Sequence, residues 1–174
     1  MQEIAAEQGI ELDPNLLFQL PGLADPASGF EGGLRFAREM LGSGLPFTAV
    51  IAFDDLTALG VVRGLTEAGL RIPEDCSVMG FDDVLPAEVA TPAMTTIRQP
   101  LNEMGQEAAH RVLQAIKRGS GKPDKPRLHK PSPELVVRMS TTRPRASLSL
   151  NGIRKDDIAE ETSAPIQMVG NKQH

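Results

Sequence analysis

Two pairs of adjacent aspartates, Asp54-Asp55 and Asp82-Asp83, are the residues whose type and spacing could support chemistry at one site. Each pair directly follows a short apolar run of strand length. Because ligands of open α/β sheets bind beyond the carboxyl ends of strands, we expect both pairs at such an edge. Carboxylates accept hydrogen bonds from neighbouring hydroxyls, so this arrangement would suit a polyhydroxylated ligand.

Other roles compete with ligand binding at both pairs. An aspartate that precedes a helical segment can cap the helix, and we expect this of Asp55 more than of Asp54. Asp82-Asp83 could instead form an Asx-type turn between strand and loop. Four carboxylates could also hold Mg²⁺ for phosphoryl chemistry, but no lysine precedes Lys117 to bind phosphate, which argues against a metal site.

No catalytic constellation stands out in the sequence. His110, His129 and His174 lack metal-ligand spacing, and Cys76 has no evident histidine partner. The glycine-rich phosphate loop, the dinucleotide-binding loop and the nucleophile elbow are missing as motifs. We therefore expect a protein that is not an enzyme and that uses no metal ion and no cofactor.

Composition narrows the class of protein further. The 174 residues carry 18 Lys+Arg against 23 Asp+Glu, a net charge of -5, which gives no broadly basic surface for nucleic acid. Without Trp or Tyr, and with six Phe, the chain lacks the aromatics of a base-stacking platform. A single cysteine rules out an internal disulfide. No membrane-length apolar run and no signal-peptide pattern is present, so we expect a cytoplasmic protein with no membrane partner.

Strands alternate with helices along the chain, which is typical of an α/β fold with a mostly parallel sheet and flanking helices. After a first helix stopped by Gly9, an apolar run of strand length occupies 16–18 and a loop 21–27. Asp25 or Ser28 is expected to cap the next helix. The remaining predicted helices cover 28–41, 54–68 and 100–118, and the predicted strands cover 48–53, 77–81, 94–98 and 134–139.

Two of these elements carry more specific expectations. The strand over 48–53 is apolar on both alternating faces, which predicts burial on both sides of the sheet. The helix over 54–68 is apolar around most of its circumference, which predicts contact with the sheet and with a partner subunit.

Several motifs recur in the order found in one family. The chain reads TAVIAFDDLTALG at 48–60, GLRIPED at 69–75, SVMGFDD at 77–83, TTIRQP at 95–100 and ELVVR at 134–138. This text resembles the effector-binding core of LacI/GalR transcription regulators over about 28–142. The resemblance implies a periplasmic-binding-protein-like fold that is incomplete here, as a fragment of the C-terminal part of that core.

The resemblance also implies a division of the chain. Residues 1–98 would form most of the C-terminal effector-binding subdomain. Residues 99–141 would supply the crossover, one helix and one strand of an otherwise missing N-terminal subdomain, and 142–174 would be a disordered tail. Operator DNA would then be bound only through a headpiece absent from this chain.

Site residues can be carried over where the motifs match. Asp82 matches the family's ligand-contacting aspartate, Gln99 matches a polar crossover residue near the effector, and Asp54 stands where the family usually has Asn. Leu59 and its helix resemble the family's dimer interface. The implied function is the effector-binding and dimerisation portion of a ligand-responsive, DNA-binding regulator that senses a small sugar-like molecule as a homodimer. The alternative is a sugar-binding protein of a transport system, which shares the fold.

Overall fold

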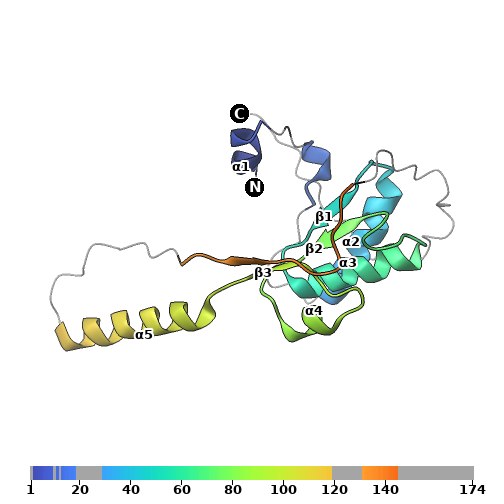
Figure 1. The fold of residues 1–174 in the computed structure, drawn as a ribbon. Coiled ribbons are helices and arrows are strands. Elements are labelled where there is room, and N and C mark those ends of the chain that lie inside the picture. Colours follow the sequence, from blue (N-terminus) through green and yellow to red (C-terminus); the bar gives the residue numbers. More distant parts are fainter. Residues whose placement is uncertain (1, 10, 12, 19–28, 119–130, 145–174) are drawn as a thin grey trace.

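The computed structural model describes residues 2–9, 11, 13–18, 29–118 and 131–144 (Figure 1). Helices and strands alternate from α2 to β3, which confirms the predicted α/β class. In chain order the elements are α1 (Gln2–Glu7), the 3-10 turn η1 (Pro14–Leu16), α2 (Phe30–Ser43), β1 (Ala49–Ile51), α3 (Asp55–Glu67), β2 (Ser77–Met79), α4 (Leu85–Val89), β3 (Thr96–Arg98), α5 (Leu101–Arg118) and β4 (Glu134–Val136).

The strands form two short ladders that are joined at one point. β1 and β2 run parallel, with Val50 opposite Val78. A parallel bridge from Met79 to Thr95 extends this pairing to the start of β3. β3 then pairs antiparallel with β4. The parallel sheet therefore lies in the body of the protein, and the β3–β4 ribbon leads out of it towards α5 (Figure 1).

The core lies where α2 packs against α3 and where α3 packs against β2. Close approach of the two helices depends on glycine, because a methyl group on Gly33 would overlap the backbone carbonyl of Thr57. Valine and leucine side chains of α3 meet aromatic and aliphatic side chains of α2 across this contact. The buried apolar residues are Phe36, Ala37, Met40, Leu41, Ala58, Val61, Leu65, Leu70, Cys76, Val78, Ala87 and Met94.

The expectation that β1 is buried on both faces is wrong. Val50 and Ala52 pack against the core, but Ile51 and Phe53 on the alternate face are 60% and 64% exposed. In the described part of the chain, α2 and α3 pack on one side of this strand only. An apolar pattern shows which side chains favour burial, and tertiary contacts decide which of them are covered.

Two local predictions also fail near the N-terminus. The run at 16–18 is predicted to be a strand, but Leu16 ends the 3-10 turn Pro14–Leu16, and of the three residues only Phe18 forms a β-bridge. Asp13 caps this turn by accepting from the Asn15 backbone amide at 2.9 Å. The sequence predicts Asp25 or Ser28 as the N-cap of α2, but the N-cap is Gly29, whose φ is 87°. The predicted loop over 21–27 and the tail from 145 lie outside the described residues.

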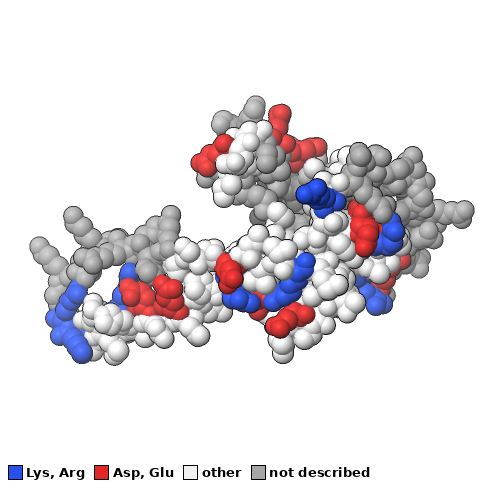
Figure 2. Space-filling view, viewed as in Figure 1, with Lys and Arg blue, Asp and Glu red and all other residues white. Residues whose placement is uncertain are grey.

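α5 stands away from the body at the end of the ribbon (Figure 1), and none of its residues is buried. The predicted helix over 100–118 is confirmed as α5, on which Glu107 and Arg111 form an ion pair at 2.6 Å. Figure 2 shows basic atoms at its far end, where the last turn holds Lys117 and Arg118. Among the described residues no helix is both long enough and apolar enough to cross a membrane.

Candidate functional site

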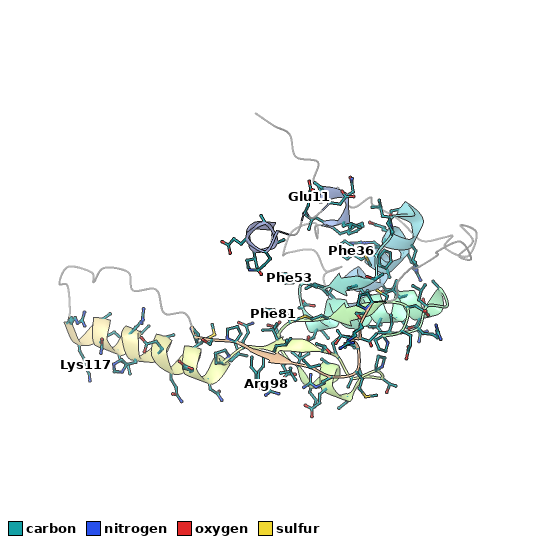
Figure 3. All side chains as sticks on the ribbon, turned by 45° about the horizontal axis from the view of Figure 1, so that its top comes forward. Glu11, Phe36, Phe53, Phe81, Arg98 and Lys117 are labelled. Carbon is teal, nitrogen blue, oxygen red and sulfur yellow. The ribbon has the colours of Figure 1, made fainter. Side chains whose placement is uncertain are left out.

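The two aspartate pairs meet at one edge of the parallel sheet, as predicted. Each pair lies a few residues beyond its strand, and the Asp55 amide donates to the Phe81 carbonyl at 2.9 Å. Figure 3 shows Phe53 and Phe81, the residues just before the two pairs, beside each other at this edge. The candidate site therefore comprises the segments that follow β1 and β2.

Asp54 and Asp55 have separate tasks, and the capping role falls on the residue that the sequence favoured less. Asp54 is the N-cap of α3: its backbone is extended, and its Oδ1 accepts from the Thr57 amide at 2.7 Å. Asp55 is the first residue of the helix and is 1% exposed. The expectation that Asp55 caps the helix is therefore wrong, because its side chain points into the interior instead.

The buried Asp55 carboxylate ties three segments together. Its Oδ1 accepts from the Thr96 hydroxyl at 2.5 Å, and its Oδ2 accepts from the Val84 amide at 2.8 Å. Gly80 lies directly against it, since a methyl group there would overlap Oδ1. Partners on both oxygens compensate the cost of burying the carboxyl group. Asp55 therefore holds together the segments that form the candidate site.

Asp82 and Gln99, two of the predicted site residues, are in direct contact. Gln99 Nε2 donates to Asp82 Oδ1 at 2.5 Å, and the Asp82 amide donates to the Ile97 carbonyl at 2.9 Å. Asp82 and Asp83 both have positive φ, 108° and 58°, so the chain turns sharply after β2. This turn places a carboxylate and an amide together where the chain enters β3 and leaves for α5.

Asp83 is held by two arginines that the sequence did not single out. Arg98 Nε and Arg138 Nη2 each lie 2.6 Å from one of its carboxylate oxygens. Burial raises the pKa of the Asp83 carboxyl, but the hydrogen bonds from Arg138 and Arg98 outweigh it and hold that pKa below its ordinary value. Both arginines stand in the quoted motifs, yet 15 and 55 residues separate them from Asp83, so no local spacing revealed the cluster.

The remaining candidates have ordinary structural surroundings. Cys76 is buried, and burial raises the pKa of its thiol to about 12. His110 on α5 lies 2.6 Å from the Gln114 amide. Within the described ranges no three His, Cys, Asp or Glu side chains are grouped so that they could hold a metal ion. Leu59 is half-buried on α3 and packs against the core.

The arrangement has a known counterpart. Residues 5–141 match the family described as the periplasmic binding protein-like domain. The chain belongs to this family. Its predicted resemblance to the core of LacI/GalR-type regulators is likewise confirmed by the relatives described next.

Curated relatives are named as transcription regulators. DegA of Bacillus subtilis is 37% identical over 136 residues, which cover 78% of this chain and 37% of that protein. The repressor PurR of Vibrio vulnificus is 45% identical over 91 residues, which cover 52% of this chain and 26% of that protein. The chain thus spans about a third or less of these relatives' length. They favour the regulator interpretation over the transport alternative, and neither is named as an enzyme.

Solved structures point the same way. A LacI-family regulator from Sanguibacter keddieii superposes with a TM-score of 0.69 and 31% identity, covering 80% of this chain and 49% of that one. The regulator CelR, solved as a complex with cellobiose, gives 0.67 and 32%, covering 80% of this chain and 40% of that one.

Proposed function

We propose that the chain is the effector-binding and dimerisation portion of a ligand-responsive, DNA-binding regulator of the LacI/GalR type, and that its effector is a small sugar-like molecule. The observation that carries this is the Asp82–Gln99 contact at the carboxyl edge of the sheet. A carboxylate beside an amide offers both acceptors and donors to sugar hydroxyls. Similarity to CelR, solved with cellobiose, and to an Enterococcus faecium regulator solved with ribose supports the choice of ligand.

In this proposal Asp54, Asp82 and Gln99 bind the effector. Asp54 uses one oxygen to cap α3, and its other oxygen accepts a ligand hydroxyl. Asp82 and Gln99 exchange part of their mutual hydrogen bonding for bonds to the sugar. The effector thus binds between the strand ends of 1–98 and the segment 99–141, which we assign to a second subdomain.

Regulation follows from differential binding. An effector that binds one arrangement of the two subdomains more tightly shifts the population towards it and so changes operator affinity. A helix-turn-helix headpiece of the regulator would bind operator DNA. The regulator itself would be a cytoplasmic protein. The coding frame upstream of Met1 tests this part: we expect it to encode such a headpiece, and an unrelated or closed frame would contradict operator binding.

Calorimetry tests the ligand site. We expect the full chain to bind ribose or cellobiose, and Asp82→Asn to weaken that binding at least about tenfold because it loses a charge-assisted hydrogen bond. Gln99→Ala should act in the same direction. Glu88→Gln, which removes an exposed carboxylate on α4, is the matched control and should leave affinity unchanged. No binding of any sugar in a broad panel, or equal affinity in Asp82→Asn, would refute the assignment.

We also propose that a homodimer forms through α3 around Leu59. The half-buried Leu59 and the exposed Leu56 leave an apolar strip on this helix beside its core-facing side. Light scattering should give twice the chain mass for the parent protein and the single mass for Leu59→Lys. Val89→Lys, which places the same charge at an exposed apolar position on α4, should stay dimeric. Dimers of Leu59→Lys would contradict this interface.

A further inference from the structure

Asp83 binds the outgoing strand β3 and the segment that follows the returning strand β4, at the point where the β3–β4 ribbon leaves the body. Its side chain is 7% exposed, and each oxygen accepts from a different arginine. Arg98 belongs to the outgoing strand β3, and Arg138 lies two residues after the returning strand β4. We call Asp83, Arg98 and Arg138 the arginine clamp. One carboxylate thus ties together the two segments that lead to and from α5.

The arginine clamp has one side fixed in the body and one side on the ribbon. Arg138 is 14% exposed, and its Nη1 donates to the Met94 carbonyl at 2.9 Å while its amide donates to the Thr95 hydroxyl at 3.0 Å. Arg98 is about half exposed and also lies 3.3 Å from Glu134 on β4. Asp83 therefore joins Arg138, which is anchored in the body, to Arg98, which lies on the ribbon.

The clamp and the candidate ligand site are formed by residues that are adjacent in the chain. Asp83 holds Arg98, and its neighbour Asp82 holds the next residue of the chain, Gln99. Both aspartates have positive φ, a conformation that L side chains adopt rarely and that surrounding bonds must maintain. A rotation of the ribbon would have to change the Asp83–Arg98 and Asp82–Gln99 contacts together.

We propose that Asp83 is a positioning residue: through Arg98 and Arg138 it fixes the orientation of the arm formed by β3, α5 and β4, and it thereby keeps Asp82 in contact with Gln99. That Asp83 affects sugar affinity rests on the proposed function. That it fixes the arm is independent of any ligand.

Spin-label distance measurements test the arm directly. Glu88→Cys on α4 and Gln106→Cys on α5 provide two exposed attachment points, while the buried Cys76 stays unlabelled. Labelled chain is diluted with unlabelled chain so that distances are measured within one molecule. Adding Asp83→Asn should broaden the distance distribution. Asp75→Asn, which also removes an arginine-bound carboxylate but on the loop before β2, should leave it unchanged.

Affinity for ribose and cellobiose provides the second measurement. Asp83→Asn should weaken whichever sugar the parent binds at least about tenfold, although Asp83 itself is not placed in contact with it. If the parent binds no sugar, the proposed function fails while the distance measurement still decides on the clamp. An unchanged distance distribution in Asp83→Asn would overturn the proposal, as would parental sugar affinity in that variant.

A further variant keeps the test valid if Asp83→Asn does not fold. Arg98→Gln removes the half-exposed side of the clamp and leaves the anchored Arg138 in place. It should broaden the same distribution, and adding it to a folded Asp83→Asn should broaden the distribution no further. A distribution of parental width in Arg98→Gln would overturn the clamp.

Discussion

Gly60 of α3 lies so close to the backbone carbonyl of Phe30 in α2 that a methyl group on Gly60 would overlap it. Gly33 of α2 meets the carbonyl of Thr57 in α3 in the same way, so each helix places a glycine against the backbone of the other. The neighbouring atoms are backbone and cannot rotate away as a side chain would. The α2–α3 contact at the centre of the core therefore tolerates no Cβ at either position.

Gly60→Ala should be strongly destabilising because the two helices must move apart to admit the methyl group. We expect it to lower the free energy of unfolding by about 3 kcal/mol, the upper end of the usual cost of overpacking. Urea unfolding followed by circular dichroism measures the change. Gly42→Ala on α2, which has open space around it, should instead stabilise by about 0.5–1 kcal/mol. Equal effects of the two substitutions would contradict this packing.

The adjacent Asp54 and Asp55 should differ in their effect on stability. Asp55→Ala leaves the Thr96 hydroxyl and the Val84 amide without their buried partner, which should cost about 3 kcal/mol. Asp54→Ala removes only a helix cap and should cost about 1 kcal/mol. Thermal and urea unfolding of the two variants compare them directly. If Asp54→Ala proved the more harmful of the two, the assignment of roles would be reversed.

Acid should weaken the protein partly through Asp83. The pKa of the Asp83 carboxyl is lowered in the folded state, whereas in the unfolded chain it has the ordinary aspartate value of about 4. As the pH falls through this range, the unfolded chain therefore binds more protons than the folded chain does. This contribution to stability is complete above that value and is lost as the pH falls through the folded-state pKa. Unfolding free energies at pH 5.5 and at successively lower pH should therefore fall less steeply in Asp83→Asn than in the parent.

Arg98→Gln refines the same measurement. It removes one of the two donors that lower the Asp83 pKa, so its loss of stability with acid should lie between those of the parent and Asp83→Asn. A parental slope in both variants would mean that the arginines do not hold Asp83 ionised.

The Cys76 thiol should be inert in the folded protein. Burial raises its pKa to about 12, and the side chain is almost inaccessible, so thiolate is scarce and reagents do not reach it. A disulfide reagent at pH 8 should titrate no thiol in the native chain and one in urea. Glu88→Cys has a new thiol that is exposed on α4, so the reagent should titrate one thiol in the native chain and two in urea. Native reaction of the parent chain would contradict the burial.

Local patterns predicted much of the fold. The predicted helices over 54–68 and 100–118 agree with α3 and α5 to within one residue at each end. The burial of β1 and the roles of Asp54 and Asp55 could not be predicted in the same way. The sequence offers both adjacent aspartates as helix caps and favours Asp55, but their hydrogen-bond partners decide between them. Those of Asp55 lie 29 and 41 residues further along the chain.

For the candidate site, too, some features could be predicted from the sequence and others could not. Its edge of the sheet was predictable, because residues after parallel strands converge there, and Asp82 with Gln99 followed from the motifs. The arginine clamp was not predictable, since Arg98 and Arg138 come near Asp83 only after β3 and β4 have paired. Sequence patterns therefore predicted that Asp82 and Gln99 belong to one candidate site, which stays a prediction as to ligand binding, and left open which charged groups hold that part of the structure together.

Among the described residues, α5 is attached to the body through the β3–β4 ribbon and has no buried residue, so a rotation at the ribbon would be amplified along the helix. Its 18 residues make it roughly 27 Å long, so turning it by about 10° at the ribbon would carry its far end through about 5 Å. Lys117 and Arg118 are at that far end. A rotation that is small at the Asp83–Arg98 contact would thus become a movement of several ångströms at the positively charged end of α5.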